Sequence, residues 1–169
     1  MNKMKLDDFL AQLNAKFPGK VLRSYKHNPK RAYVDIDPKD IRAFTAYIFK
    51  DEGLRFHIAS AVDTFDGMEI LYHFTHDPSD FIISVRVLLK DRDKPSIETI
   101  TDITSAAWWI EREMHELFGI GFEGNKDLRR LLLPDDWPDG VYPLKKDFIV
   151  PKRDSRDNVH KPHAEGGPK

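Results

Sequence analysis

One short segment, EREMHE from Glu111 to Glu116, concentrates side chains that could do chemistry. Carboxylates and histidine are ligands for zinc, and the same groups serve as general acids and bases. Tryptophan and arginine nearby are also the residue types that anchor protein interfaces. The segment therefore has three candidate roles: a metal or acid–base site, a salt-bridged structural helix, or a docking surface.

The helix that must carry this segment is predicted from about Ile103 to Leu117 by apolar residues at helical spacing. Its core-facing stripe is formed by Ile103, Ala106, Ala107, Ile110, Met114 and Leu117. On this phase Glu111 and His115 share the outer face. Trp108 lies opposite the stripe, where Arg112 at the next turn could stack on it. These outward side chains favour the docking interpretation.

A metal site on this helix has little support in the spacing. Glu111 and His115 could supply two ligands, but Glu113 lies on the other side of the helix. The pattern is not His-Glu-x-x-His, and Arg112 holds the position where the Glu-x-x-His pattern of di-iron bundles needs glutamate. A small metal-dependent hydrolase that uses Glu111 and His115 remains an alternative.

One cross-strand pair of histidines is predicted in a hairpin. If Asp66-Gly67 is a two-residue turn, His57 faces His76 and Ser60 faces His73 on the paired strands. A cross-strand histidine pair can bind zinc, but two ligands are too few for a closed site. An ordinary strand surface is the favoured interpretation.

The composition excludes several function classes. The 169 residues include no cysteine, so no thiolate-bound cluster or cysteine nucleophile can form. The charges balance, with 27 Lys and Arg against 28 Asp and Glu. A nucleic-acid adaptor could use Arg129, Arg130, Lys145 and Lys146. However, residues 104–150 carry six basic and nine acidic residues, a net charge of −3, which would repel a phosphate backbone. We expect no nucleic-acid partner.

The elements around the segment predict an α+β fold, with helices packed on a mostly antiparallel sheet. Two helices are expected near residues 6–17 and 37–53. A meander of three strands is expected at residues 54–65, 68–76 and 81–90. Residues 1–150 would form one domain with a long ordered C-terminal loop, and residues 151–169 an extended tail. No signal peptide or membrane span is apparent, so the expected compartment is the cytoplasm.

The second half of the chain resembles a known family. Glu111-Arg112-Glu113 followed by ELFG, then DLRRLLLPDDW and YPLKKDF, is similar to the 30 kDa subunit family of respiratory NADH dehydrogenase (complex I). Within the family, MHELFGI and LLPDDWPDGVYPL resemble the versions found in energy-converting, membrane-bound [NiFe] hydrogenases and related archaeal complexes more than the mitochondrial type. The family often has His-Pro where this chain has Asn125-Lys126, so a role of that histidine is not carried over.

The resemblance implies a cofactor-free structural subunit of the peripheral arm, without turnover of its own. Its partners would be the hydrogenase-like large subunit and the small iron–sulfur subunit. The chain would lie on the inner face of the cell membrane, in contact with it only through the complex.

These implications locate a docking surface on the helix and the loop after it. The expected partner-binding residues are Trp108, Arg112, His115, Arg129, Arg130, Trp137, Tyr142, Lys145 and Lys146. Glu113 at the edge of the stripe would form an ion pair with Arg129 or Arg130. That pair would pin the loop from Asn125 to Phe148 in extended form.

Overall fold

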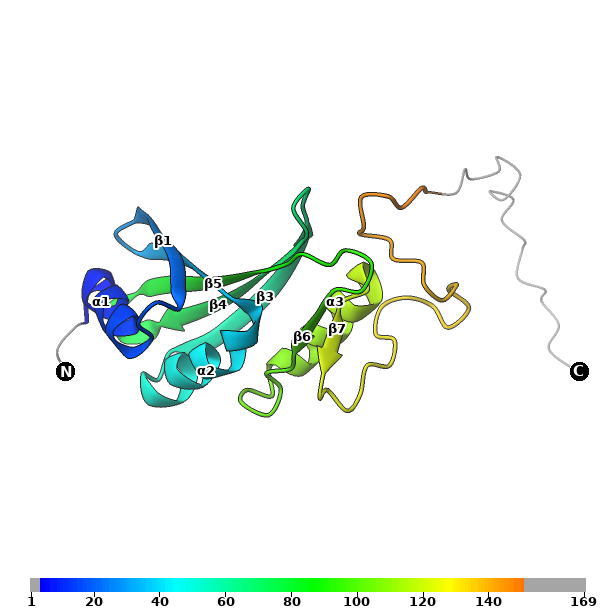
Figure 1. The fold of residues 1–169 in the computed structure, drawn as a ribbon. Coiled ribbons are helices and arrows are strands. Elements are labelled where there is room, and N and C mark those ends of the chain that lie inside the picture. The colour runs from blue at the N-terminus through cyan, green and yellow to red at the C-terminus, as the bar shows by residue number, and fades with distance from the viewer. Residues whose placement is uncertain (1–3, 151–169) are drawn as a thin grey trace, which may run out of the picture.

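The scaffold is a five-stranded sheet with the strand order β1-β2-β5-β4-β3 (Figure 1). The strands are β1 (Val21–Asn28), β2 (Arg31–Ile36), β3 (Arg55–Asp63), β4 (Met68–His76) and β5 (Phe81–Leu89). All neighbours pair antiparallel except β2 and β5, which are parallel. This computed structural model describes residues 4–150; the predicted tail lies outside the described residues. The predicted α+β fold with a mostly antiparallel sheet is confirmed.

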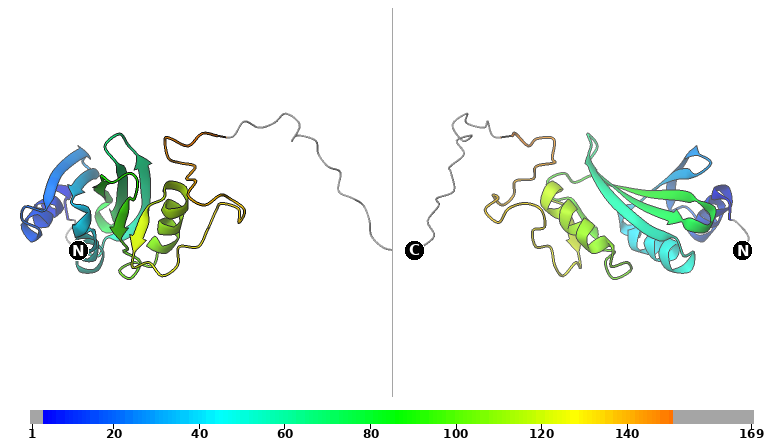
Figure 2. Two further views of the ribbon diagram at one scale, coloured as in Figure 1. Left: turned by 45° about the vertical axis from the view of Figure 1, so that its right-hand side comes forward. Right: turned by 180° about the vertical axis from the view of Figure 1, so that it is seen from behind.

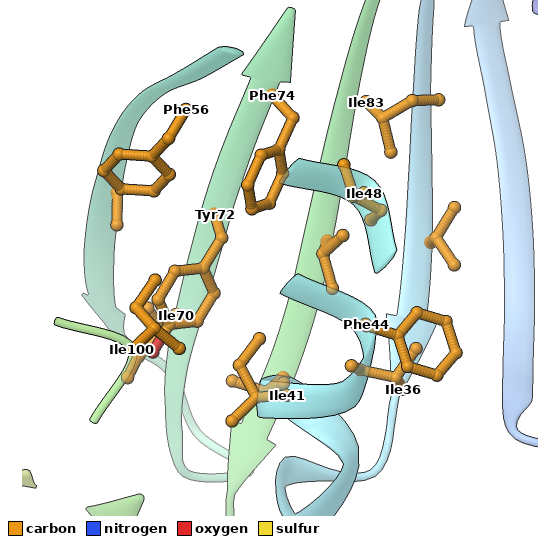
Figure 3. Packing of buried hydrophobic residues seen from close by; sticks show 14 of the residues in the cluster. Ile36, Ile41, Phe44, Ile48, Phe56, Ile70, Tyr72, Phe74, Ile83 and Ile100 are labelled. Atoms are coloured by element: carbon orange, nitrogen blue, oxygen red, sulfur yellow. The ribbon is translucent and has the colours of Figure 1, made fainter. Parts of the chain in front are cut away.

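One face of the sheet carries the hydrophobic core, because alternate residues of each central strand point the same way. Helix α1 (Leu6–Lys16) contributes Phe9 and Leu13, both fully buried. The second predicted helix is divided into a 3-10 turn η1 (Pro38–Asp40), α2 (Ile41–Ala46) and a π-helical turn η2 (Tyr47–Asp51). Figure 3 shows how this second helical segment packs on the sheet. None of the helices within residues 4–150 is long and apolar enough to cross a bilayer.

The hairpin between β3 and β4 differs from its prediction. Its loop has four residues rather than two, because Asp63 pairs with Met68. The Thr64 amide and hydroxyl both donate to the Gly67 carbonyl, and these bonds close the longer loop. Gly67 has φ 147°, and a Cβ there would lie 2.2 Å from the Leu89 carbonyl oxygen, so the close approach requires glycine.

The predicted register is therefore wrong. With the longer loop Ile58 faces His73, and a bulge at His57 then shifts the pairing further, so that Phe56 faces Phe74. His57 and His76 are not opposed. The Ser60 hydroxyl still lies 3.4 Å from Nε2 of His73, although Ser60 is paired with Leu71.

A smaller unit follows the main sheet. It consists of helix α3 (Ala107–Phe118) and two short parallel strands, β6 (Ser96–Glu98) and β7 (Gly121–Glu123). The strands were not predicted, and α3 begins four residues later than expected, because residues 101–106 form turns. Helix α3 packs on the edge strand β3, and the loop after β7 runs along its other side (Figures 1 and 2).

Candidate partner-binding surface

Helix α3 is covered on two sides, which changes the predicted orientation of its side chains. Its buried residues are Ala107, Glu111, Met114, Glu116 and Phe118. Glu111, expected on the outer face, is only 1% exposed, whereas Ala106 of the predicted stripe is exposed. The outer-face prediction for Glu111 is wrong because hydrophobic periodicity identifies the apolar side of a helix and not a buried polar side.

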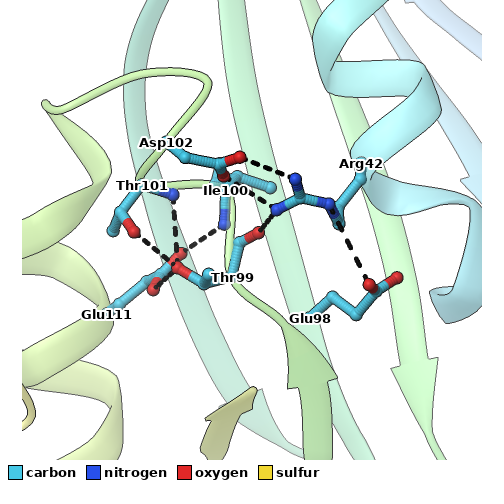
Figure 4. A network of polar contacts seen from close by, with 7 residues as sticks. All are labelled: Arg42, Glu98, Thr99, Ile100, Thr101, Asp102 and Glu111. Carbon is cyan, nitrogen blue, oxygen red and sulfur yellow. Dashed lines mark hydrogen bonds and ion pairs between the residues drawn. The ribbon is translucent and has the colours of Figure 1, made fainter. Parts of the chain in front are cut away.

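The Glu111 carboxylate is held by three hydrogen-bond donors, and Figure 4 draws two of them, Thr99 and Ile100. The Thr99 hydroxyl donates at 2.5 Å, the Ile100 amide at 2.9 Å and the Asn125 side-chain amide at 2.9 Å. Burial raises the pKa of Glu111, and the three hydrogen bonds oppose that rise. This carboxylate therefore ties α3 to the segment before it and to the start of the loop after β7.

The same network reaches the second helical segment through Arg42. The guanidinium forms two hydrogen bonds with Asp102, at 2.8 and 2.7 Å, and a third with the Thr99 carbonyl at 2.5 Å. Beside it lies an open cleft of about 550 Å³, whose wall includes Trp108 and Lys126. The network thus fixes the smaller unit against the main sheet and leaves a polar cleft at their junction.

The two residues of the proposed metal site have separate structural roles. Nδ1 of His115 lies 2.9 Å from the Ile120 carbonyl oxygen, so the imidazole is bonded to the backbone after the helix. Glu111 is enclosed by its three donors. Within residues 4–150 no three His, Asp or Glu side chains come together as metal ligands.

The loop after β7 is held to α3 through its backbone. Nε and Nη2 of Arg112 donate to the carbonyls of Arg129 and Arg130, at 2.9 and 2.7 Å. One helical turn later, the Glu116 carboxylate accepts the amides of Leu131 to Leu133, at 2.7 to 3.3 Å. We call these two side chains the Arg112–Glu116 clamp. The Arg112 guanidinium donates to two successive loop carbonyls, and the Glu116 carboxylate accepts from three successive loop amides. The loop backbone therefore supplies hydrogen-bond partners to both charged side chains.

The predicted ion pair of Glu113 with Arg129 or Arg130 does not form. Arg129 pairs instead with Asp127, and this contact lowers the pKa of Asp127 to about 2. Arg130 pairs with Asp139 at 2.7 Å. Within the described residues Glu113 has no ion pair. A glutamate of α3 does pin the loop, but it is Glu116, whose position on the helix brings it beneath the loop amides.

The later part of the loop is anchored close to the end of α3. Gly119 ends the helix with φ 75°, and the Tyr142 ring lies directly over it; a Cβ on Gly119 would be 2.6 Å from that ring. The Leu144 amide donates to the Leu117 carbonyl at 3.1 Å. The Lys146 amide donates to the buried Asp63 at 2.8 Å. The loop thus follows a defined path although residues 125–150 contain no helix or strand.

Side chains from the helix and the loop surround one hollow of about 380 Å³. The predicted partner-binding residues that line it are His115, Arg129, Arg130, Trp137 and Tyr142. Lys145 and Lys146 lie nearby, stacked over Tyr142 and Phe65 at 5.0 and 3.8 Å. The structure therefore brings most of the predicted residues together around the loop.

Two tryptophans and a leucine remain exposed beside the loop. Trp108 is 43% exposed, and Trp109 and Leu132 are each 62% exposed. The Arg112 guanidinium stacks on Trp109, at 5.3 Å, and not on Trp108 as predicted. The predicted stacking is wrong because Arg112 turns toward the loop carbonyls. We call the exposed side of α3 and the loop, with Trp108, Trp109 and Leu132, the α3–loop surface.

Sequence reasoning missed Glu116 as the buried residue that holds the loop and Trp109 as an exposed residue of the surface. Glu116 stands four residues after Arg112 on the same side of the helix, which was the available signal. The hydrogen-bond partners of Glu116, however, are backbone amides, and every residue type except proline has one. The residue types of the loop therefore do not indicate this contact.

The order of these motifs along the chain matches a known family. The family model described as "Respiratory-chain NADH dehydrogenase, 30 Kd subunit" matches residues 34–154. The chain belongs to this 30 kDa subunit family. The match includes β3 to β7, α3 and the whole anchored loop, so the α3–loop surface lies inside the family domain.

Relatives of this 30 kDa family member occur in several complexes. A relative from the F(420)H(2) dehydrogenase of Methanosarcina mazei is 34% identical over 89% of this chain and 96% of the relative. Hydrogenase-4 component G of Escherichia coli is 30% identical over 83% of this chain and 26% of the relative. The chain spans about half of the length of relatives from NADH-quinone oxidoreductases, one of them from Chloroherpeton thalassium.

A solved structure shares the fold. One chain of the membrane-bound sulfane sulfur reductase, an archaeal respiratory membrane complex, matches with a TM-score of 0.75 and 28% identity. The match covers 85% of each chain. This 30 kDa family member is thus a homologue of subunits of complex I-like membrane oxidoreductases.

Proposed function

We propose that this chain is a cofactor-free structural subunit of a membrane-bound, complex I-like oxidoreductase and that its α3–loop surface holds the neighbouring subunits. The observation that carries the proposal is the Arg112–Glu116 clamp. It fixes a long loop without secondary structure, while Trp109 and Leu132 beside it remain exposed. A segment held in one conformation before binding loses little entropy when it docks, which favours a stable interface.

The partners in this proposal are the hydrogenase-like large subunit and the small iron–sulfur subunit of the same complex. Hydrogenase-4 component G supports the first of these, because this chain spans only 26% of that relative. In that hydrogenase component, a domain of this kind is therefore joined to a much longer part in one polypeptide. The absence of cysteine from the sequence supports a role in which iron–sulfur clusters belong to a partner.

The place of the chain in this proposal is the peripheral arm, on the inner face of the cell membrane. Contact with the membrane is indirect, through the complex. The contribution to electron transfer is mechanical: the chain braces the redox subunits and so keeps the distances between their centres constant. It has no turnover of its own.

The test compares co-purification of the complex with a tagged full-length chain in the native host. Trp109→Glu and Leu132→Glu place a charge on the α3–loop surface and should each abolish recovery of the large subunit. Ile58→Glu is the matched control, since Ile58 is 43% exposed on β3, away from the loop. Full recovery of the large subunit with both variants would show that this surface is not the interface.

A further inference from the structure

The opposite end of the molecule carries a basic and aromatic strand that the proposed function does not use. From Lys20 to Arg31 the sequence KVLRSYKHNPKR contains five basic residues, one histidine and no acidic residue. It forms β1 and the turn into β2, far from the anchored loop (Figures 1 and 2). We propose that the outer edge of β1 binds an acidic, extended polypeptide segment of a partner protein, which adds to the sheet as a further strand.

The backbone of β1 is available for this pairing. Within the described residues β1 pairs only with β2, so its outer side is the edge of the five-stranded sheet. Every residue from Leu22 to Asn28 is exposed. An edge strand presents a row of unpaired amides and carbonyls, which an incoming extended segment can pair with. At eight residues, β1 is long enough to form several such hydrogen bonds.

The side chains beside this edge form a receptor for alternate residues of the added strand. Arg23, Tyr25 and His27 of β1 line a hollow of about 350 Å³ together with Tyr33 and Arg86. Tyr25 is 50% exposed and stacks on Tyr33 at 6.3 Å between ring centres. Tyrosine and arginine are the residue types that dominate interface energetics. The hollow opens on the sheet face that the helices leave uncovered.

The charges identify which kind of segment fits. The three lysines of the basic segment are already neutralised by aspartates, in the pairs Lys20–Asp40, Lys26–Asp7 and Lys30–Asp80. Arg86 is bonded twice to Asp35. Within residues 4–150, Arg23 and Arg31 have no ion-pair partner. Arg23 lies on the edge strand itself and lines the hollow, so its guanidinium is the one that carboxylates of a partner would meet first.

Other occupants of the edge are disfavoured by the same charges. A second copy of this chain would place one basic β1 against another. The chain's own residues 151–169 carry five basic and three acidic residues, so they also have the wrong sign. Two arginines are too few for a nucleic-acid backbone, whose binding depends on many simultaneous phosphate contacts. An acidic segment of another protein satisfies both the edge and the charge.

The experiment measures fluorescence anisotropy of labelled octapeptides with the full-length chain. The probes are an alternating Glu-Val peptide, the equivalent Lys-Val peptide, and the Glu-Val peptide with alternate backbone amides N-methylated. We expect the Glu-Val peptide to bind at least tenfold more tightly than either of the others. Hydrogen exchange of the β1 amides should slow when it binds, because pairing protects them.

Variants of the chain separate charge from strand pairing. Arg23→Glu should weaken binding of the Glu-Val peptide at least tenfold, and Arg31→Glu, one strand in from the edge, should weaken it less. Lys50→Glu is the matched charge reversal on the helical layer that covers the other sheet face, and it should change binding less than twofold. If Arg23→Glu lowers the melting temperature of the chain, Arg23→Gln replaces it, with a smaller loss in the same direction.

Four results would overturn the proposal. Equal binding of the Glu-Val and Lys-Val peptides would show that charge does not determine binding. Unchanged binding after N-methylation would show that the peptide does not pair with β1 as an added strand. Tighter binding of a labelled single-stranded oligonucleotide would assign the edge to nucleic acid. Binding of none of the probes would show that the basic residues only protect the edge from aggregation. None of these results touches the α3–loop surface, so assembly of the complex is tested separately.

Discussion

At the residue scale, the position of one carboxylate decides whether the loop is held. Glu116 accepts three consecutive amides, whereas Glu113, three residues earlier, has no ion pair within the described residues. Glu116→Gln replaces one acceptor oxygen by an amide nitrogen that can only donate, and an unsatisfied buried backbone amide costs about 1–3 kcal/mol. We expect faster hydrogen exchange at the Leu131 and Leu132 amides, with a loss of global stability no larger than this cost.

Glu113→Gln is the matched control for this measurement, and it should leave the exchange of the loop amides unchanged. The reverse pattern, with slow exchange in the Glu116 variant, would show that other contacts hold the loop.

Glu111 gives a pH dependence with a definite sign. Burial raises its pKa in the folded chain above the usual value of 4.5. Its favourable contribution to the free energy of unfolding is therefore complete below that usual value and is lost as the pH rises through the raised pKa. The stability of the wild type relative to Glu111→Gln should fall as the pH rises from about 4.5 toward neutrality. Denaturant titrations of both proteins across this range measure it.

Subtracting the stability of Glu111→Gln from that of the wild type cancels the contributions of the other carboxylates. Asp127 and Asp102 are examples: their pKa values are lowered, so their contributions to stability change with pH in the opposite sense. A difference that rises with pH would mean that the three donors outweigh burial at Glu111.

At the scale of the element, the end of α3 depends on a glycine for two reasons. Gly119 has a positive φ, and the Tyr142 ring occupies the space beside it. Gly53 has a similar φ of 69°, but a Cβ there would meet no atom within 4 Å, so it isolates the backbone effect. Gly53→Ala should cost about 1–2 kcal/mol. Gly119→Ala should cost more, because Tyr142 must also move.

The extra cost can be assigned by thermal unfolding in a Tyr142→Ala background. There, Gly119→Ala and Gly53→Ala should cost the same. A remaining excess at Gly119 would point to a clash other than Tyr142.

Elements with strong local signals were predictable, and those that depend on distant partners were not. Helix α1 and strands β3 to β5 follow from apolar periodicity and turn residues. Strands β6 and β7 are three residues each and exist because they pair with one another across α3, which no local pattern reveals. The hairpin register failed for a related reason: Asp66-Gly67 indicates a turn, but Thr64 extends the loop by bonding to Gly67.

At the scale of the whole molecule, folding and assembly use different aromatic residues. Phe9 is fully buried in the core, whereas Trp108 is 43% exposed on the α3–loop surface. Phe9→Ala should cost about 3–5 kcal/mol of stability. Trp108→Ala should change the melting temperature little and weaken binding to the complex, where an interface tryptophan can contribute about 2 kcal/mol or more. Calorimetry of the lone chain and recovery of the complex test the two halves of this prediction.

Strong destabilisation of the lone chain by Trp108→Ala would mean that the tryptophan supports the fold through the cleft beside Arg42. Unchanged recovery of the complex would remove Trp108 from the interface.

The location of the site could be predicted from the sequence better than the hydrogen-bond partners of its charged side chains. The exposed tryptophan, the glycines after α3 and the Pro-rich loop indicate a helix with an ordered segment beside it. The partner of each charge could not be predicted, because Arg112 and Glu116 bind backbone groups. Those partners are set by the path of the loop, and the path is a property of the folded chain.

The Arg112–Glu116 clamp has a consequence for how such a protein can diverge. The clamp forms its hydrogen bonds with backbone groups from Arg129 to Leu133, so these bonds do not depend on the side chains of that segment. Leu132 and its neighbours can then be exchanged while the loop keeps its course. One scaffold could thereby present different side chains to different partner subunits. The path of the loop would stay the same, and only the residues that it exposes would change.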